Sequence, residues 1–322
     1  MELRIDDLKK TYGSVKALKG ISYSFTPGVY GILGANGAGK STMINLITDN
    51  VSRDKDGGSI TYCDGYNTCG NSQEYNCNDN EKTISGEPLD ILKLGAKFRG
   101  IVGYMPQQQG FYEDFSPKAF LKYMAEIKGV KAIKSVDDNG KVTVKKVGQQ
   151  IDELLGIVNL TSVAYKKIGG FSGGMKQRVL LAQALLGNPK ILDEPTAGLD
   201  PKERIAIRNY IAELSKDKII LFATHVVSDI ECIADKVLLL KNGEIIATGT
   251  PSQLIEQMQG KVGELTCTLD DVASLQEKYH IGNIRQRKDG LVLRLVGDEL
   301  PGEAVKVDND IDLEDVYLYY FE

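Results

Sequence analysis

The sequence has no long apolar segment. No run of apolar residues approaches the roughly 18 to 20 that a membrane-spanning helix needs, and the first residues, MELRIDDLKKTYG, have no apolar signal region. The five cysteines show no zinc-ligand spacing, and the three at positions 63, 69 and 77 stand in one polar segment without a nearby histidine. We therefore expect a soluble chain with free thiols that reaches a membrane only through a partner.

An excess of positive charge is absent as well. The 322 residues include 39 Lys and Arg against 44 Asp and Glu, which gives a formal net charge of -5. Nucleic-acid-binding domains usually carry a basic surface, so DNA and RNA are not expected partners. The 42% hydrophobic content excludes a disordered chain and is sufficient for a large core.

Strands and helices alternate along most of the chain. GVYGIL (28–33) and KIILFATH (218–225) are continuous apolar runs, which are typical of strands covered on both faces. Ser116 followed by Pro117 predicts the start of a helix whose apolar stripe, Ala119 to Ile127, packs in the core. The alternation predicts an α/β fold with a parallel central sheet.

Three segments differ from this pattern. Residues 51–90 are rich in Asn, Gly and Asp and predict an exposed loop insertion. Residues 135–146 contain an Asn-Gly pair and predict a small hairpin. After about Gly249, short apolar runs and a closing LEDVYLYYF predict a small α+β appendage.

GANGAGKS at residues 34–41 fits the phosphate-loop pattern of Gly, four residues, then Gly-Lys-Ser. The glycines let backbone amides curl around an anion, and the start of the following helix adds partial positive charge. Lys40 can neutralise the outer phosphates, and the Ser41 hydroxyl can ligate magnesium. Because the motif stands between a strand and a helix, it predicts a nucleotide site.

An acidic pair, Asp193 and Glu194, follows only two aliphatic residues. Alone, the pair could be two solvated carboxylates at a strand end. In a chain with a phosphate loop, Asp193 fits the outer ligand of a magnesium ion, and Glu194 fits the group that orients or deprotonates a water at the terminal phosphate.

Two further features are weak when taken singly. Ser172-Gly173-Gly174 has the form of an anion-binding helix start, although an ordinary helix cap has the same form. His225 ends an apolar run, where a structural histidine is the usual finding. Only the phosphate loop and the acidic pair turn both into candidate site residues.

Together the motifs resemble the nucleotide-binding subunit of an ATP-binding cassette (ABC) transporter, in family order over nearly the whole chain. The six are GANGAGKST, MPQ with Gln107, FSGGMKQR, ILDEP, AGLD with Asp200, and ATH with His225. The resemblance implies a P-loop NTPase core of ABC type over residues 1–248, with an antiparallel β subdomain and a helical signature subdomain at about 107–188. Residues 249–322 would form an accessory α+β domain.

The resemblance also implies ATP and Mg²⁺ as cofactors, bound between two subunits that close head to tail. Glu194 would polarise the water, Gln107 would sense the magnesium and γ-phosphate, and His225 would hold the γ-phosphate. The implied ATP-binding residues are Tyr12, stacked on adenine, with Gly34, Asn36, Gly37, Ala38, Gly39, Lys40, Ser41 and Thr42. The implied metal ligands are Ser41, Gln107 and Asp193, and the residues acting across the dimer are Ser172, Gly173, Gly174 and Asp200.

The implied partner is a separate membrane-spanning permease, which a homodimer or paired cassette powers from the cytoplasmic face of the cell membrane. Residues 108–128 would face that permease. Met175 in the signature and the closing LEDVYLYY are similar to exporter subunits. Two alternatives remain: a soluble cassette ATPase, disfavoured by a single cassette without sustained heptads, and an ATP-binding regulatory subunit with weak or no hydrolysis.

The short apolar run before the acidic pair departs from the family pattern. Family members usually place about four aliphatic residues there, so this chain loses roughly 7 Å of strand. Removing two residues preserves which side chains face which side. The pair still reaches the nucleotide if Asn188-Pro189-Lys190 is drawn into the strand, or if the Gly-Asn-Pro turn is pulled towards the sheet.

Overall fold

The structure is a computed structural model that describes residues 1–64, 87–105, 112–136, 142–193, 201–223, 226–287 and 290–321. The chain forms two compact units. Unit 1 contains Met1–Val29 and Ser41–Phe222, and unit 2 contains Tyr30–Lys40 and Ala223–Glu322. This division does not follow the predicted boundary at residue 249, which stays a prediction.

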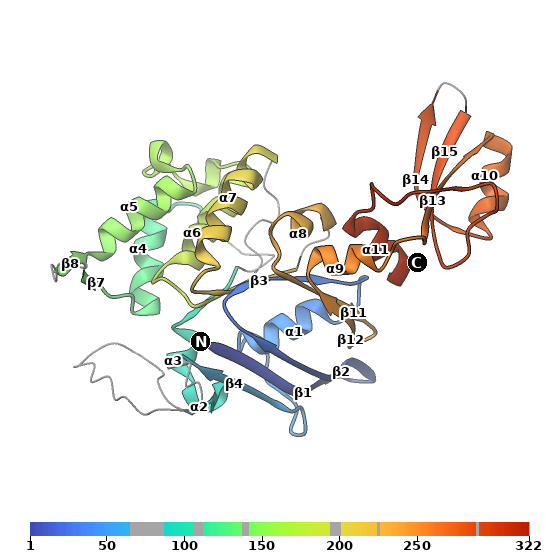
Figure 1. The fold of residues 1–322 in the computed structure, drawn as a ribbon. Coiled ribbons are helices and arrows are strands. Elements are labelled where there is room, and N and C mark those ends of the chain that lie inside the picture. Colours follow the sequence, from blue (N-terminus) through green and yellow to red (C-terminus); the bar gives the residue numbers. More distant parts are fainter. Residues whose placement is uncertain are drawn as a thin grey trace. The chain divides into compact units, whose positions relative to one another are not determined.

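An antiparallel sheet in unit 1 has the strand order β2-β1-β4-β5 (Figure 1). Its strands are β1 (Glu2–Tyr12), β2 (Val15–Phe25), β4 (Ser59–Cys63) and β5 (Leu89–Asp90). β4, with five residues, and β5, with two, lie within residues 51–90, so the predicted loop insertion is wrong for both strands. Residues 65–86 of the predicted loop lie outside the described residues. Ile60 and Tyr62 are buried, and the Tyr62 ring meets Phe98 edge-on at 5.9 Å between centroids. β4 is short and stands among turn-forming residues, so the composition of the segment predicts a loop and gives no sign of the strand.

Three parallel strands form a second layer in unit 1: β6 (Val102–Gly103), β9 (Ile191–Asp193) and β10 (Ile219–Phe222). β10 is buried throughout, as its continuous apolar run predicts. β9 lies between its two neighbours, with Ile191 opposite both Val102 and Ile219. Hydrogen bonding to β6 on one side and to β10 on the other therefore fixes the position of β9.

Helices make up most of the remainder of unit 1. They are α1 (Lys40–Ile47), α2 (Ile91–Leu94), α3 (Ala96–Arg99), α4 (Pro117–Lys128), α5 (Val147–Ile157), α6 (Gly173–Leu185) and α7 (Pro201–Leu214), with short 3-10 turns at Thr161–Val163 and Ile168–Gly170. α4, α5 and α6 pack on one another. Between α4 and α5 the chain forms the hairpin β7 (Ile133–Val136) and β8 (Val142–Lys145), which confirms the expected hairpin.

The helix α4 begins as predicted but buries a different face. The Ser116 hydroxyl accepts a hydrogen bond from the Ala119 amide at 3.3 Å. Phe120 is buried as expected, but its buried companions are Pro117, Leu121 and Ala125, whereas Ala119, Tyr123 and Ile127 are exposed. The predicted stripe is therefore wrong for those three residues. The Tyr123 ring instead packs beside the rings of Tyr112 and Phe115.

Unit 2 contains a sheet with the order β12-β11-β3, where β3 (Gly28–Leu33) enters the unit at Tyr30. β11 (Lys236–Lys241) runs parallel to β3 and antiparallel to β12 (Glu244–Gly249). The helix α8 (Val227–Ile233) lies so close to β3 that a Cβ on Gly31 would sit 2.2 Å from Ile230. Glycine is therefore required at that position.

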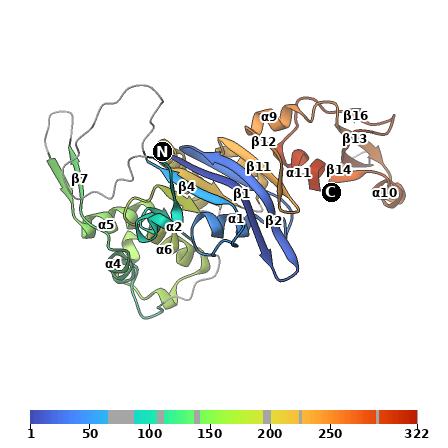
Figure 2. The same cartoon turned by 90° about the horizontal axis from the view of Figure 1, so that it is seen from below.

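The C-terminal part of unit 2 is an α+β arrangement (Figure 2). Its sheet has the order β14-β15-β13-β16. The elements are α9 (Pro251–Glu256), β13 (Val262–Cys267), α10 (Leu269–Gln276), β14 (His280–Arg287), β15 (Gly290–Val296), β16 (Val305–Lys306) and α11 (Leu313–Phe321). The helix α11 packs on α8 and α9, whereas the C-terminal sheet has a core cluster of its own around Leu265, Leu293 and Leu295.

Candidate nucleotide site

The loop that follows β3 has the backbone of a phosphate cradle. All six residues of β3 are buried, and the loop from Gly34 leads directly into α1. Gly37 and Gly39 have φ values of +81° and +106°, a region that only glycine adopts readily. Alternation of such residues turns successive amides towards one side, which suits an anion. A Cβ on Gly34 would meet the Leu240 carbonyl oxygen at 2.4 Å, so close packing also requires glycine there.

Lys40 is held inside this loop. Its side chain is 9% exposed, and its Nζ donates hydrogen bonds to the carbonyl oxygens of Gly34 (2.5 Å) and Ala35 (3.0 Å). The loop is closed at its far side, because the Gly243 amide donates to the Ala38 carbonyl at 3.0 Å. A buried ammonium among amides is a donor set that fits a polyphosphate.

The other predicted residues of the loop lie in the expected places along the chain. Ala38 is buried, whereas Asn36 and Ser41 are exposed and Thr42 is half-buried in the first turn of α1. The exposed Ser41 hydroxyl at a helix start is a suitable magnesium ligand. Their contact with a nucleotide stays a prediction.

Tyr12 lies at the end of β1, opposite Val15 across the β1–β2 turn. Its side chain is 47% exposed, and the Lys10 ammonium stands 5.4 Å from the ring centroid. Lys10 is in turn bonded to Asp54 at 2.7 Å, and this hydrogen bond lowers the pKa of the Asp54 carboxyl. An exposed aromatic ring has a face free to stack on a base, and the stacking of Tyr12 on adenine stays a prediction.

Ser172 caps the signature helix α6. Its hydroxyl accepts a hydrogen bond from the Met175 amide at 3.3 Å, and Gly173 and Gly174 form the first turn. A Cβ on Gly173 would meet no atom within 4 Å, so packing within the chain does not demand glycine there. Open space above a capped helix start is consistent with a group approaching from outside the chain.

Arg178 is a feature of the signature helix that the motif alone does not reveal. Its Nη1 donates to the carbonyl oxygens of Val158 and Asn159, at 3.3 and 3.1 Å, just after α5 ends. Those carbonyls have no partner within α5, so Arg178 links the end of α5 to α6. The FSGGMKQR motif places an arginine here, but only the fold shows what it contacts.

The shortened strand before the acidic pair is accommodated at its start. The Lys190 amide donates to the Ile101 carbonyl at 2.7 Å, and the Lys190 carbonyl accepts from the Ile219 amide at 2.9 Å, so the ladder begins before β9 itself. Pro189 is buried, and a Cβ on Gly103 would lie 2.9 Å from its Cγ. The Gly-Asn-Pro turn is therefore drawn against β6, as one of the two expected accommodations requires. Asp193 ends β9 opposite Leu221.

Several predicted site residues lie outside the described residues. They are Gln107, Glu194, Asp200 and His225, and of Asp193 only the backbone is described. Within the described ranges, no group of three or more His, Cys, Asp or Glu side chains could hold a metal ion. No described helix is long and apolar enough to cross a bilayer.

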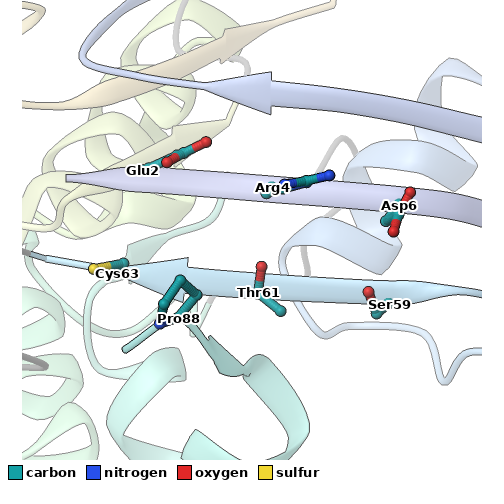
Figure 3. A pocket seen from close by; sticks show the side chains of 7 residues that line it. All are labelled: Glu2, Arg4, Asp6, Ser59, Thr61, Cys63 and Pro88. Atoms are coloured by element: carbon teal, nitrogen blue, oxygen red, sulfur yellow. The ribbon is translucent and has the colours of Figure 1, made fainter. Parts of the chain in front are cut away.

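A polar cavity of about 320 Å³ lies on the antiparallel sheet, apart from the predicted site residues (Figure 3). It is lined by Glu2, Arg4 and Asp6 of β1, Ser59, Thr61 and Cys63 of β4, and Pro88. Arg4 stands between two carboxylates on one strand face, so the lining is close to neutral. The period-two pattern in β1 is visible in the sequence, but it indicates only a half-exposed strand, so the cavity was not predicted.

Comparison with known proteins identifies the family to which these motifs belong. The family described as ABC transporter matches residues 18–197, more than half of the chain. An uncharacterized ABC transporter ATP-binding protein, YxlF of Bacillus subtilis, is 33% identical over 285 residues, which cover 88% of this chain and 82% of that protein. The Nod factor export ATP-binding protein I of a Rhizobium species is 30% identical over 257 residues, covering 79% and 72%.

Solved structures agree with this assignment. A structure of the ATP-binding subunit of an ABC transporter has a TM-score of 0.61 and 24% identity, and the match covers 86% of this chain and all of that one. A nucleotide-free ATP-binding cassette from an ABC transporter has a TM-score of 0.58 and 26% identity, covering 78% and 92%. These likenesses confirm the predicted α/β P-loop NTPase fold of ABC type. The chain belongs to the ABC transporter family, as an ATP-binding subunit.

Proposed function

We propose that this subunit hydrolyses ATP and thereby powers a separate membrane permease, with export as the direction of transport. The observation that carries the proposal is the loop at residues 34–40, with its left-handed glycines and the buried ammonium of Lys40. Among the relatives is an ATP-binding protein of Nod factor export, and that name supports export.

The chain's own residues divide the work as follows. Lys40 and the loop amides bind the phosphates, while Tyr12 stacks on the adenine. Ser41, Gln107 and Asp193 would hold a magnesium ion, which supplies charge neutralisation at the phosphates when bound. Glu194 orients the attacking water and accepts its proton, and His225 donates a hydrogen bond to the γ-phosphate.

A second copy of the chain completes the site in this proposal. Ser172, Gly173 and Gly174 at the start of α6 would contact the γ-phosphate held by the opposite subunit, together with Asp200. The open space above Gly173 supports this arrangement, because an outside group has room to approach the helix start. The assembled pair would sit at the cytoplasmic face of the membrane through the permease.

Hydrolysis is tested on the purified full-length chain with Mg²⁺ and ATP, with and without its permease. We expect Glu194→Gln to lower turnover by roughly 10² to 10⁴-fold, because the general base is lost, while ATP binding persists and an ATP-bound dimer accumulates. Glu213→Gln, an exposed carboxylate of α7, is the matched control and keeps wild-type turnover.

Two results would contradict the proposal. Tight ATP binding without turnover, with the permease present, would assign the chain to the regulatory class. Co-purification with ribosomes or DNA, in place of a membrane protein with several spans, would assign it to the soluble cassette ATPases.

A further inference from the structure

Positive charge is concentrated in one stretch of an otherwise acidic chain. Residues 118–146, from the first turn of α4 to the residue before α5, contain eight lysines and three acidic residues, which gives a net charge of +5. Lys118 and Lys145 pair with acidic residues of α5, and Lys128 is partly buried. Among the described side chains of the stretch, the remaining exposed positive charge is therefore carried by Lys122, Lys131 and Lys146. The whole chain has a net charge of -5. Such local asymmetry favours an anionic partner for this part of unit 1.

The hairpin β7–β8 within this stretch is fixed at its base. The buried Gln150 side chain of α5 donates from Nε2 to the carbonyl oxygens of Lys131 (2.9 Å), two residues before β7, and of Lys145 (3.3 Å), the last residue of β8. The Lys145 ammonium also pairs with Glu153 at 2.5 Å. The chain is therefore attached to α5 where it enters and where it leaves the hairpin, and the hairpin stands at the end of the α4–α5 pair (Figures 1 and 2).

The anchored hairpin presents apolar side chains to solvent. Val142 and Val144 of β8 are 58% and 49% exposed. Because they are two residues apart on a strand, both lie on the same face. A two-stranded hairpin is marginally stable alone, so one that is anchored by polar contacts and still exposes its valines is suited to contact a partner.

An apolar groove of about 470 Å³ opens at the base of the hairpin, between α4 and α5. Its floor includes Ala125, Val130, Val147 and Ile151, and its rim carries Lys118, Lys122 and one acidic residue, Glu126. Lys131 and Lys146 flank the hairpin and are exposed, as is Lys122. Groove and hairpin together form an apolar surface bordered by lysines, which we call the hairpin surface.

We propose that the hairpin surface binds the anionic headgroup layer of a lipid bilayer. The positive charge of this surface comes entirely from lysine, since residues 118–146 contain no arginine. Arginine is the residue that recognises carboxylates in a fixed bidentate geometry and that dominates protein interfaces, whereas lysine is a mobile point charge. Flexible lysines around small apolar side chains match a diffuse anionic surface better than they match a folded acidic partner.

The proposal goes beyond ATP hydrolysis and is tested without nucleotide or permease, so its failure and that of the ATPase proposal are distinguishable. The full-length chain is floated with phosphatidylcholine vesicles, with and without phosphatidylglycerol. We expect flotation only with phosphatidylglycerol, and release at high salt, where exposed charges are screened. Lys131→Gln with Lys146→Gln should lower partitioning about 25-fold, at about fivefold per lysine.

Apolar contact is tested by Val142→Ser with Val144→Ser, which should also lower partitioning. Matched controls are Lys278→Gln with Lys306→Gln, and Leu269→Ser with Val305→Ser, all exposed positions of unit 2 that should leave flotation unchanged. Thermal unfolding establishes that each variant is folded. Absence of flotation by the wild-type chain, or equal loss in the controls, overturns the proposal. If the variants float normally but no longer co-purify with the permease, the hairpin surface binds a protein and the lipid proposal is overturned.

Discussion

Lys128, the last residue of α4, shows how one partly buried cation couples stability to pH. Its Nζ donates to the Gln183 carbonyl at 3.0 Å, and burial lowers the pKa of this ammonium from 10.5 to about 8. In the unfolded chain the ordinary pKa returns. Between about pH 8 and 10.5 the unfolded state therefore binds more protons, and the free energy of unfolding rises with pH.

We expect this rise to be at most ~3 kcal/mol for Lys128, and to vanish in Lys128→Met, which has no proton to release. Urea unfolding of both proteins from pH 8 to 9.5 measures it. The window ends there because burial raises the pKa of Tyr62, which opposes the effect once unfolded tyrosines ionise. Equal pH slopes in the two proteins would show that Lys128 is not the source.

Single residues differ in how far the sequence reveals them. Lys40 and the serine cap at Ser172 belong to motifs whose spacing specifies where they stand in the chain. The serine cap is present, and Lys40 is buried in the loop, while its contact with phosphate stays a prediction. Lys128 and Arg178 have no such signal, because their partners are backbone carbonyls in another helix or just after one. Burial of a lysine depends on which helices meet, and periodicity within one helix does not contain that information.

At the scale of elements, the Gln150 side chain is bonded to the chain at both ends of the hairpin β7–β8. Gln150→Leu would fill similar space but leave the carbonyls of Lys131 and Lys145 without their donor. We expect faster amide exchange in residues 142–146, by roughly tenfold per 1.4 kcal/mol of lost local stability. Hydrogen exchange read by mass spectrometry measures this, with the exposed Gln276→Leu as control. Unchanged protection in Gln150→Leu would mean that the hairpin is held elsewhere.

Elements were predictable where one pattern extended over enough residues. β3 and β10 are continuous apolar runs, and both are buried strands. β4 was missed because its five residues follow turn formers, and its burial comes from pairing with β1, more than 50 residues earlier. The buried face of α4 was misassigned in part, since exposed Tyr123 has aromatic neighbours that make it look like a core position.

At the scale of the whole molecule, the last described helix returns to unit 2's earlier elements. The Leu313 amide, at the start of α11, donates to Glu231 of α8 at 3.0 Å. Asp315, in the first turn, accepts from Arg294 at 2.8 and 2.7 Å, and both residues are buried. Contacts over such sequence distances explain why the compact units could not be predicted from composition alone.

Removing one partner of this buried pair should be costly. We expect Asp315→Asn to lower the free energy of unfolding by about 3 to 5 kcal/mol, because it leaves the Arg294 guanidinium buried without its carboxylate. Asp298→Asn, an exposed carboxylate near Lys261, is the control and should cost less than about 1 kcal/mol. Chemical denaturation compares the two. Similar losses would indicate that the pair contributes little more than a surface contact.

The position of Lys40 has a consequence for how fast and how tightly an anion is captured. Its ammonium left bulk water when the chain folded, and the carbonyls of Gly34 and Ala35 now solvate it. An arriving phosphate therefore strips little water from the cation itself, and it feels the charge through a medium of low polarity, where attraction is stronger. Most of the dehydration on association then falls on the ligand, so affinity should depend more on the ligand's own charge than on the lysine's hydration.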